Sequence, residues 1–316
     1  MKELAEGVLR GEPGAASRAL TWVVDERAGH EELWRRLYPH SGRAHKVGFF
    51  GPPGSGKSSL IGAMIALLRA RGEKVGVLAV DPTSPFTGGA FLGDRLRLQE
   101  HVLDRGVFMR SLASRGTLGG LTAGIFGAIR VLEAYGCDRI LIETVGTGQD
   151  EVEVAKVVDS VILVTTPFLG DEIQGLKAGS MEIADLFIIN KADLEGSDRA
   201  LGDLRRALAM GEEKPGAWKP PVIAASATQG RGLDEILKAL TEHAEFLKSS
   251  GEGARRRKAQ AFEELSIYVT QRVYQDVRKG IKEAHLNSLL EKRTDPVSLG
   301  RALVAGRKAK RSKAKI

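Results

Sequence analysis

The chain has 316 residues, of which 42% are hydrophobic, so it can bury the core of one large domain with helical extensions, or of two domains. No apolar run approaches the roughly 20 residues of a membrane span. The first residues lack a signal-peptide segment, and the single cysteine, Cys137, excludes disulfide frameworks and cysteine metal cages. We therefore expect a soluble, cytoplasmic protein without a membrane span.

The net charge of +7 comes from one end of the chain. Residues 301–316 carry 7 basic side chains and no acidic one, which leaves 40 basic residues to balance the 40 acidic residues. Such a tail can touch RNA or a membrane surface, but a solvated, disordered end explains it more simply. We expect a disordered tail at 307–316 and no specific nucleic-acid partner.

The first 45 residues are expected to form short helices. Leu4, Val8 and Leu9 make a first apolar stripe, and two more stripes follow around Leu20 and Leu33. No residue here suggests chemistry, so we interpret residues 1–45 as a helical extension that packs on the main domain.

From residue 46 to about residue 248, short apolar runs alternate with helical stretches. The runs are continuously apolar, as expected for strands buried on both faces of a parallel sheet. The helices between them predict a three-layer α/β domain that binds ligands beyond the carboxyl ends of its strands. The six runs are Lys46–Phe50, Val75–Val80, Arg139–Ile142, Ser160–Val164, Leu186–Ile189 and Pro221–Ala225.

The first of these strands leads into Gly51-Pro52-Pro53-Gly54-Ser55-Gly56-Lys57-Ser58, followed by Ser59 and an apolar helix. This segment fits the phosphate-loop pattern G-x-x-x-x-G-K-[ST], in which backbone N–H groups converge and the helix N-terminus adds partial positive charge. Lys57 is expected to hold the outer phosphates of a nucleotide, and the Ser58 hydroxyl to ligate Mg²⁺. The alternative, a glycine-rich turn that binds nothing, does not explain the strand, loop and helix together.

Carboxylates stand at the tips of the next strands or just beyond them. Asp81 follows the second run, Asp94 lies in the long loop after it, and Glu143 follows the third run. Mg²⁺ prefers oxygen ligands, keeps several waters and uses few protein carboxylates. Each residue alone is explained equally well as a turn or cap residue, but together they predict a magnesium site that also positions water.

An N-K-x-D sequence, Asn190-Lys191-Ala192-Asp193, follows the fifth run. An ionised Asp193 can accept hydrogen bonds from N1–H and the amino group of guanine. Adenine presents an acceptor there, and an unpaired buried polar group costs about 1–3 kcal/mol. The stem of Lys191 can cover the base plane, and backbone N–H groups of Ser226-Ala227-Thr228, after the sixth run, can meet the guanine oxygen. We therefore predict a guanine nucleotide.

Two more segments are expected at the ligand edge. Residues 110–120 form a glycine-rich loop before a helix at 121–134, and Arg110 or Arg115 can reach the nucleotide or a partner unless the loop is only a flexible surface segment. After the fourth run, residues 166–179 form a polar loop that we interpret as a moving element.

Helices are also expected beyond residue 248, after a short linker. One runs from about residue 254 to 279 and ends at Gly280, a second stretch carries Leu286 and Leu290, and Asp295-Pro296 begins a last short helix. Their apolar faces pack on their own domain or, in the interpretation that we prefer, on a second copy of the chain. We thus expect a GTPase domain at 46–248 and a helical dimerisation arm at 249–306.

Together these motifs resemble the MeaB/ArgK family of G3E P-loop GTPases, which includes the methylmalonic aciduria type A protein. The resemblance spans nearly the whole chain; the family usually has a small or β-branched residue where Ser55 stands. The motifs that carry it are Gly51–Ser58, Asp81–Ser84, Thr87–Gly89 with Leu92–Asp94, Arg115–Gly120, Glu143–Gly146 with Gly148-Gln149, Gly170–Glu172 with Gln174-Gly175, and Asn190–Asp193.

The resemblance implies a GTP-hydrolysing chaperone of an adenosylcobalamin-dependent acyl-CoA mutase, of the methylmalonyl-CoA mutase type. Such a protein gates cofactor loading and protects or reactivates the mutase, and the resemblance admits an adenosyltransferase as a further partner. By matching position, Asp81, Asp94 and Glu143 would be magnesium and switch carboxylates. The loop from Pro167 to Lys177 would be a switch that responds to the mutase; its polar residues are Asp171, Glu172, Gln174 and Lys177.

For the reaction, we expect water to hydrolyse the terminal phosphate of GTP while Lys57, Ser58 and Mg²⁺ offset the developing charge. Thr147 follows the switch glycine where small GTPases place a water-orienting glutamine, so unassisted hydrolysis should be slow. Gln149 is the candidate substitute. A mutase that orders Asp94, Gln149 or the Lys177 loop would raise the rate.

Other classes of protein stay open. A nickel- or cobalt-insertion GTPase has a similar nucleotide site but usually carries histidine-rich or Cys-x-x-Cys segments, and this chain has 6 scattered histidines and one cysteine. An amino-acid transport-associated kinase needs a phosphoacceptor site or lid, and the sequence suggests neither. A purely structural binding module would not need Asp94 and Glu143.

Overall fold

The computed structural model describes residues 1–82, 104–114, 123–144, 153–167, 178–210 and 216–313. Its centre is a seven-stranded sheet with the order β3-β2-β4-β1-β5-β6-β7, and every neighbouring pair is parallel. The α/β fold predicted from the apolar runs is therefore confirmed. The strands are β1 His45–Phe50, β2 Val75–Pro82, β3 Val107–Ser114, β4 Arg139–Thr144, β5 Ser160–Thr165, β6 Leu186–Ile189 and β7 Val222–Ala224.

Strand β3 is the element that the sequence prediction missed. Residues 110–114, assigned above to a loop, form the second half of this strand, which pairs with β2 from Val107↔Val75 onward. β3 is an edge strand with one neighbour, so it needs no continuous apolar run, and Arg110 and Ser111 interrupt its hydrophobic pattern. The prediction of a loop at Arg110 was wrong for that reason.

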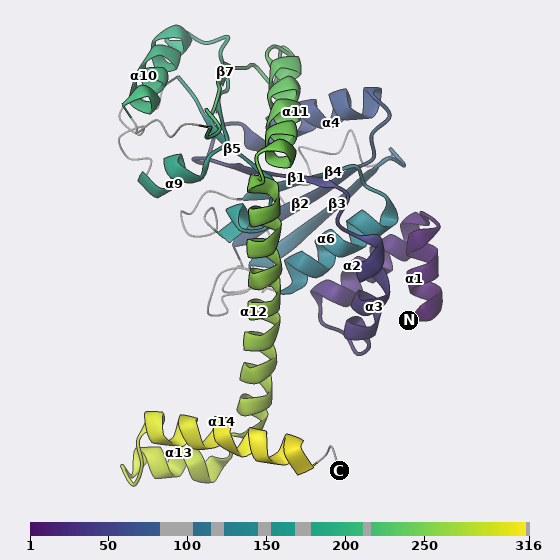
Figure 1. Ribbon diagram of the computed structural model, residues 1–316, viewed down its shortest axis with the longest axis vertical. Coiled ribbons are helices and arrows are strands. Elements are labelled where there is room, and N and C mark those ends of the chain that lie inside the picture. The colour runs from purple at the N-terminus through teal and green to yellow at the C-terminus, as the bar shows by residue number, and fades with distance from the viewer. Residues whose placement is uncertain (83–103, 115–122, 145–152, 168–177, 211–215, 314–316) are drawn as a thin grey trace. The chain divides into compact units, whose positions relative to one another are not determined.

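Helices cover both faces of the sheet (Figure 1). On one face, α4 (Lys57–Ala70) and α11 (Leu233–Ser249) share a core with inward side chains of the strands, such as Phe49 and Ile162. On the other face lies α6 (Ala123–Tyr135), so close that a Cβ on Gly76 of β2 would stand 2.9 Å from a side-chain carbon of Leu132. Two shorter helices are α9 Ala178–Ile183 and α10 Ser197–Ala209.

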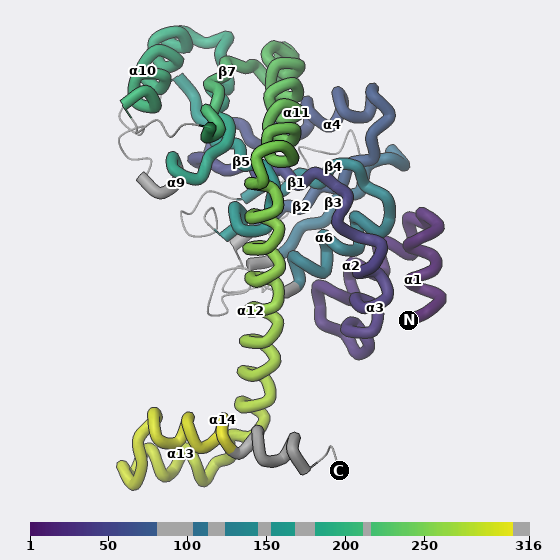
Figure 2. Tube along the Cα trace, viewed as in Figure 1, coloured from purple at the N-terminus to yellow at the C-terminus, as the bar shows by residue number. Residues whose placement is uncertain are grey.

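The N-terminal helices pack on α6, as Figure 2 shows along the chain trace. A Cβ on Gly127 of α6 would stand 3.0 Å from Cβ of Val23, so the two helices are in close contact there. Val8, Leu20 and Leu33 are buried, as the apolar stripes predict, whereas Leu9 is 40% exposed. The helices are α1 Lys2–Leu9, α2 Pro13–Val24, α3 His30–Leu37 and the 3₁₀ turn η1 Tyr38–His40.

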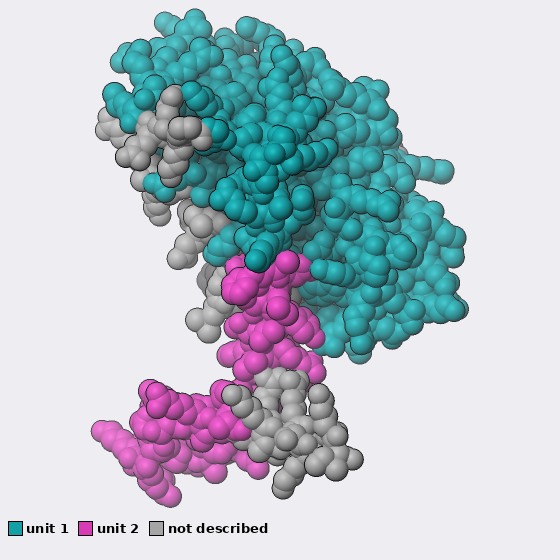
Figure 3. All heavy atoms as spheres, in the orientation of Figure 1, with its two compact units in different colours: residues 1–260 teal, residues 261–316 magenta. Residues whose placement is uncertain are grey.

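The chain separates into two compact units, residues 1–260 and 261–316, coloured in Figure 3. The division falls inside the long helix α12 (Glu252–Gly280). The second unit continues with α13 (Glu283–Leu290) and α14 (Pro296–Lys313). Among the described residues, no helix combines the length and the apolar character needed to cross a membrane.

Helix α14 differs from its prediction because it runs to Lys313, through most of the tail for which the sequence predicts disorder. Asp295 Oδ1 accepts hydrogen bonds from the N–H groups of Val297 and Ser298, each at 2.9 Å, so it caps the helix as expected. Alanine, lysine and arginine, which dominate residues 301–313, are strong helix formers, and they extend the helix past its expected end.

Candidate functional site

The phosphate loop joins β1 to α4, and its glycines hold positions that other residues cannot take. Gly51 has φ 137°, and a Cβ there would lie 2.0 Å from the carbonyl oxygen of Val164 in β5. Gly56 has φ 85°, and its Cβ would lie 2.3 Å from Nδ2 of Asn190. The loop is thus pressed against β5 and the segment after β6, which places it at the carboxyl ends of the strands.

Lys57 is the first residue of α4, and its side chain folds over the phosphate loop. Its Nζ donates hydrogen bonds to the carbonyl oxygens of Gly51, at 2.8 Å, and Pro52, at 3.1 Å. The ammonium group is therefore held against the loop, beside the N-terminus of α4. That combination of positive charges suits an anionic ligand such as a phosphate.

Ser58 and Glu143 meet beside this loop. The Ser58 hydroxyl donates a 2.7 Å hydrogen bond to Oε1 of Glu143, and both residues are buried. The contact arises because β1 and β4 are neighbours with Phe49 opposite Glu143. Asp81 lies at the carboxyl end of β2, next to β4, although its side chain is outside the described part of the structure. Ser58 and Glu143, two of the predicted magnesium ligands, therefore have their side-chain oxygens next to each other.

Asn190 joins the phosphate loop to the loop after β7. Its Nδ2 donates to the carbonyl oxygens of Ser55 at 2.9 Å and Gly56 at 3.4 Å, while its Oδ1 accepts from the N–H of Ala227 at 3.2 Å. The side chain is buried. The sequence placed Asn190 among the nucleotide-binding residues but did not reveal this bridging position, because its partners are far away along the chain.

Of the remaining guanine-motif residues, Lys191, Asp193 and Thr228 are exposed, where a base can reach them, whereas Ser226 is buried. Asp193 is exposed, and the Ser226 side chain, which is buried, donates a hydrogen bond that lowers the pKa of the Asp193 carboxyl below 3.8. Lys191 is exposed and adopts the left-handed conformation, with φ 59°. Ala227 and Thr228 follow Ser226 directly. An ionised, exposed carboxylate can accept the hydrogen bonds that a guanine edge donates.

Other predicted site residues are not brought to this place by the described structure. Arg110 lies in mid-strand opposite Leu78, before the end of β3 at Ser114. The remaining candidates fall outside the described residues and stay predictions. These are Asp94, Arg115, Gln149, Asp171, Glu172, Gln174 and Lys177.

The bridge made by Asn190 predicts a large effect of Asn190→Ala. The substitution leaves the buried carbonyl of Ser55 and the half-buried N–H of Ala227 without this partner, and we expect the free energy of unfolding to fall by about 1–3 kcal/mol. Bound nucleotide should also dissociate faster, because two loops of the site lose their connection. Urea unfolding and stopped-flow release of a fluorescent GDP measure the two effects. Asn287→Ala, at an exposed position of α13, is the control, and equal behaviour of both variants would contradict the bridging role.

Comparisons with known proteins agree with this geometry. Residues 16–282 match the family model "Methylmalonyl Co-A mutase-associated GTPase MeaB". The chain is 45% identical over 300 residues to a Pyrococcus horikoshii protein named as a GTPase, with 94% of this chain and 95% of that protein covered. It is 38% identical over 272 residues to the Escherichia coli GTPase ArgK, with 83% and 82% covered. A crystal structure of a LAO/AO transport system kinase superposes with a TM-score of 0.70 at 27% identity, over 97% of both chains. The chain therefore belongs to the MeaB family of P-loop GTPases.

Proposed function

We propose that this GTPase is a chaperone of an adenosylcobalamin-dependent acyl-CoA mutase, of the methylmalonyl-CoA mutase type. It would gate loading of the cobalamin cofactor and protect or reactivate the mutase, with an adenosyltransferase as a further partner. The observation that carries the proposal is the match of residues 16–282 to a family described as mutase-associated. The nucleotide site supports it, because a GTPase cycle needs phosphate-binding and base-reading groups at one sheet edge.

At the phosphate end, we propose that Gly51 to Ser59 bind the phosphates and that Lys57 holds the outermost one. The Ser58 hydroxyl and the Glu143 carboxylate are hard oxygen donors only 2.7 Å apart, which fits a magnesium ion. Asp81 and Asp94 complete the proposed ligand set. When bound, Mg²⁺ supplies positive charge that offsets the charge on the phosphate oxygens. Gln149 is the proposed residue for orienting the attacking water.

At the base end, we propose that Asp193 accepts hydrogen bonds from guanine and that Lys191 covers the base. Asn190 holds the two loops together. The N–H groups of Ser226 and Ala227 donate to Arg231 and Asn190 inside the fold, so in the segment from Ser226 to Thr228 the N–H of Thr228 is the proposed donor to the guanine oxygen. An aspartate carboxyl is ionised at neutral pH and can then only accept hydrogen bonds, as this role requires.

The partner role is tested by GTP turnover with and without the purified mutase. We propose that unassisted hydrolysis is slow and that the mutase acts through the loop that carries Asp171, Glu172, Gln174 and Lys177. Partner proteins raise the rate of GTP hydrolysis by about 10³–10⁵-fold in well-studied GTPases. We therefore expect the mutase to raise the turnover rate by far more than the error of the measurement. Lys177→Ala should reduce the stimulation while leaving the unassisted rate unchanged. Equal turnover with and without every candidate mutase would contradict the chaperone proposal.

We also propose that residues 249–306 form a dimerisation arm. Apolar side chains of α12 are exposed within the second unit: Phe262 is 70% exposed and Leu265 is 61% exposed. Burying such side chains against a second copy would contribute about 1.5–3 kcal/mol each. Leu265→Glu should therefore raise the dimer dissociation constant, measured by sedimentation equilibrium, by at least about tenfold. Met210→Glu, at an apolar position that is 86% exposed in the first unit, is the control, and the same effect of both variants would contradict the arm.

A further inference from the structure

The loop after β7 lies side by side with the guanine motif that follows β6. The N–H of Ala192 donates to the carbonyl oxygen of Ala225 at 2.9 Å, and the N–H of Ala227 donates to Oδ1 of Asn190 at 3.2 Å. Ser226 stands between these two contacts along the chain and is only 1% exposed. Its position relative to the guanine motif is therefore fixed on both sides.

The backbone of Ser226 is also held within its own loop. Its N–H donates to the carbonyl oxygen of Arg231 at 3.0 Å, and the N–H of Arg231 donates back to that of Ser226 at 3.2 Å. Gly232, with φ 77°, follows this bridge, and a Cβ there would lie 2.4 Å from the carbonyl oxygen of Ala224 in β7. The N–H of Ser226 is thus used inside the fold, so its predicted role in nucleotide binding needs another explanation.

The hydroxyl of Ser226 supplies that explanation. It donates a hydrogen bond to the carboxylate of Asp193, which can only accept when it is ionised. A serine hydroxyl has a single proton, so in the 3.3 Å contact between Oγ of Ser226 and Oγ1 of Thr228 the donor is Thr228. We call Thr228, Ser226 and Asp193, in this order of donation, the carboxylate brace.

The carboxylate brace leaves Asp193 free to bind a base. A carboxylate has about four lone-pair sites, and the bond from Ser226 takes one of them, so two donors of guanine can still be accepted. An exposed aspartate without such a partner would sample several rotamers, and binding would then have to fix one of them at a cost in entropy. The bond from Ser226 fixes the side chain beforehand.

Thr228 also carries the backbone group proposed to meet the guanine oxygen. It is exposed, and its N–H has no hydrogen-bond partner within the described part of the chain. On guanine, the oxygen stands beside N1–H and the amino group, which are the proposed donors to Asp193. One hydrogen-bonded unit would therefore present both the donor and the acceptor that this edge of the base requires.

We propose that Thr228 is a positioning residue for guanine recognition, whose hydroxyl acts through Ser226 to hold the Asp193 carboxylate in place for the base. This inference rests on the proposed base-reading role of Asp193 and adds the two residues that orient its side chain. Neither hydroxyl touches the base. Removal of either one should weaken the contacts of Asp193 with guanine and leave the contacts of the phosphate loop unchanged.

Inosine diphosphate isolates the contact that the carboxylate brace supports, because inosine lacks the amino group of guanine. The ratio of the dissociation constants for inosine diphosphate and GDP is measured by titration calorimetry of the full-length protein with magnesium. Ser226→Ala should lower this ratio about tenfold, and Thr228→Val, which keeps the backbone N–H, about threefold. Thr228→Ser, which keeps the hydroxyl, should restore it. An unchanged ratio in Thr228→Val would overturn the proposal.

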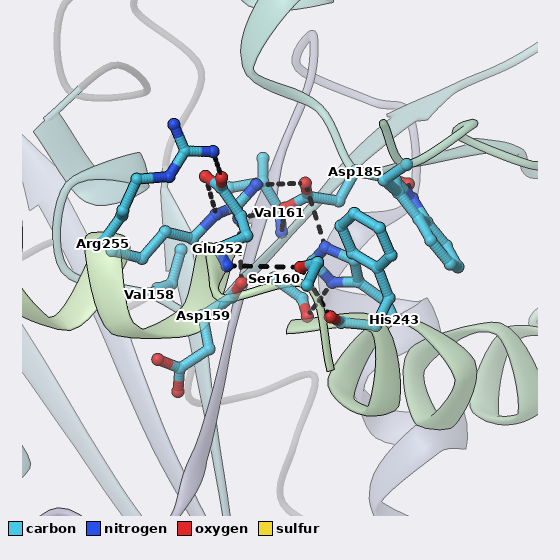
Figure 4. A network of polar contacts seen from close by, with 12 residues as sticks. Val158, Asp159, Ser160, Val161, Asp185, His243, Glu252 and Arg255 are labelled. Atoms are coloured by element: carbon cyan, nitrogen blue, oxygen red, sulfur yellow. Dashed lines mark hydrogen bonds and ion pairs between the residues drawn. The ribbon is translucent and has the colours of Figure 1, made fainter. Parts of the chain in front are cut away.

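A buried serine at the opposite edge of the sheet provides the matched control. Ser160, the first residue of β5, is 0% exposed, and its Oγ lies 2.7 Å from Nδ1 of His243. Figure 4 shows the two side chains directed toward one another. Ser160→Ala removes a buried hydroxyl as Ser226→Ala does, so it should lower the melting temperature but keep the ratio. An equal fall of the ratio in both variants would mean that it reports general loosening, and the proposal would be wrong.

Carbon NMR of the Asp193 carboxyl tests the carboxylate brace without any nucleotide. The bond from Ser226 stabilises the ionised form and lowers the pKa of Asp193 below 3.8. Ser226→Ala should raise this pKa toward 3.8, and Thr228→Val should raise it by less; Asp193→Asn assigns the signal. An unchanged pKa in Ser226→Ala would overturn the carboxylate brace. If the pKa rises as expected but Asp193→Asn leaves GDP affinity unchanged, the proposed base reading fails instead.

A double-mutant cycle tests whether Thr228 acts through Asp193. Thr228→Val should weaken GDP binding in the unmodified protein and have no further effect in Asp193→Asn, because the carboxylate that it helps to hold is gone. If Thr228→Val weakens GDP binding by the same factor in both backgrounds, Thr228 acts independently of Asp193 and the inference is wrong.

Discussion

Asp193→Asn should lower the affinity for GTP by about 10²–10⁴-fold and raise the affinity for xanthosine triphosphate. A hydrogen bond to a charged group is worth about 1.5–3 kcal/mol, and Asp193 is proposed to accept two of them from guanine. The amide that replaces the carboxylate presents an N–H donor to the donors of guanine. Xanthine carries an oxygen in place of the amino group, and that oxygen can accept from the amide.

Titration calorimetry with both nucleotides measures this exchange of specificity. Asp198→Asn is the matched control, because Asp198 lies in the first turn of the nearby helix α10, outside the proposed base site. The control should bind GTP as the unmodified protein does. Unchanged GTP affinity in the Asp193 variant would show that this carboxylate does not read the base.

Lys57→Ala should reduce single-turnover GTP hydrolysis by about 10²–10³-fold, the usual cost of losing one electrostatic group that stabilises a transition state. In the structure, Lys57 Nζ is held by the carbonyl oxygens of Gly51 and Pro52, so its charge already sits inside the phosphate loop. Release of free phosphate from GTP, with no acceptor added, is the readout. It also distinguishes hydrolysis from a kinase reaction.

Two controls keep this result interpretable. Lys238→Ala removes a lysine that is 77% exposed on α11 and should leave hydrolysis unchanged. The melting temperature of the Lys57 variant shows whether the loop still folds without its two hydrogen bonds. A folded variant that hydrolyses GTP at the original rate would contradict the role given to Lys57.

The phosphate end of the site could be predicted because its information is local. The segment from Gly51 to Ser58 contains its own turn glycines, its lysine and its hydroxyl, and a helix follows directly. To predict that Ser58 lies near Glu143, one must also expect the carboxyl ends of parallel strands to lie at the same edge of the sheet. The structure agrees with that expectation, because Phe49 at the end of β1 is opposite Glu143 of β4.

What the sequence did not reveal depends on contacts between distant residues. The bridge from Asn190 to Ser55 spans 135 residues, and the contact between Ser160 and His243 spans 83. Neither leaves a periodic or local pattern in the sequence. Strand β3 was missed for the opposite reason, because an edge strand is free to carry polar residues such as Arg110 within its run.

The central proposal is that one nucleotide site binds phosphates at the Lys57 end and selects guanine at the Asp193 end. The most direct measurement is titration calorimetry of the purified full-length protein with GDP and with ADP, both in the presence of magnesium. We expect GDP to bind at least about 10²-fold more tightly, because ADP leaves the Asp193 carboxylate facing an acceptor. Equal affinity for the two nucleotides would contradict the account.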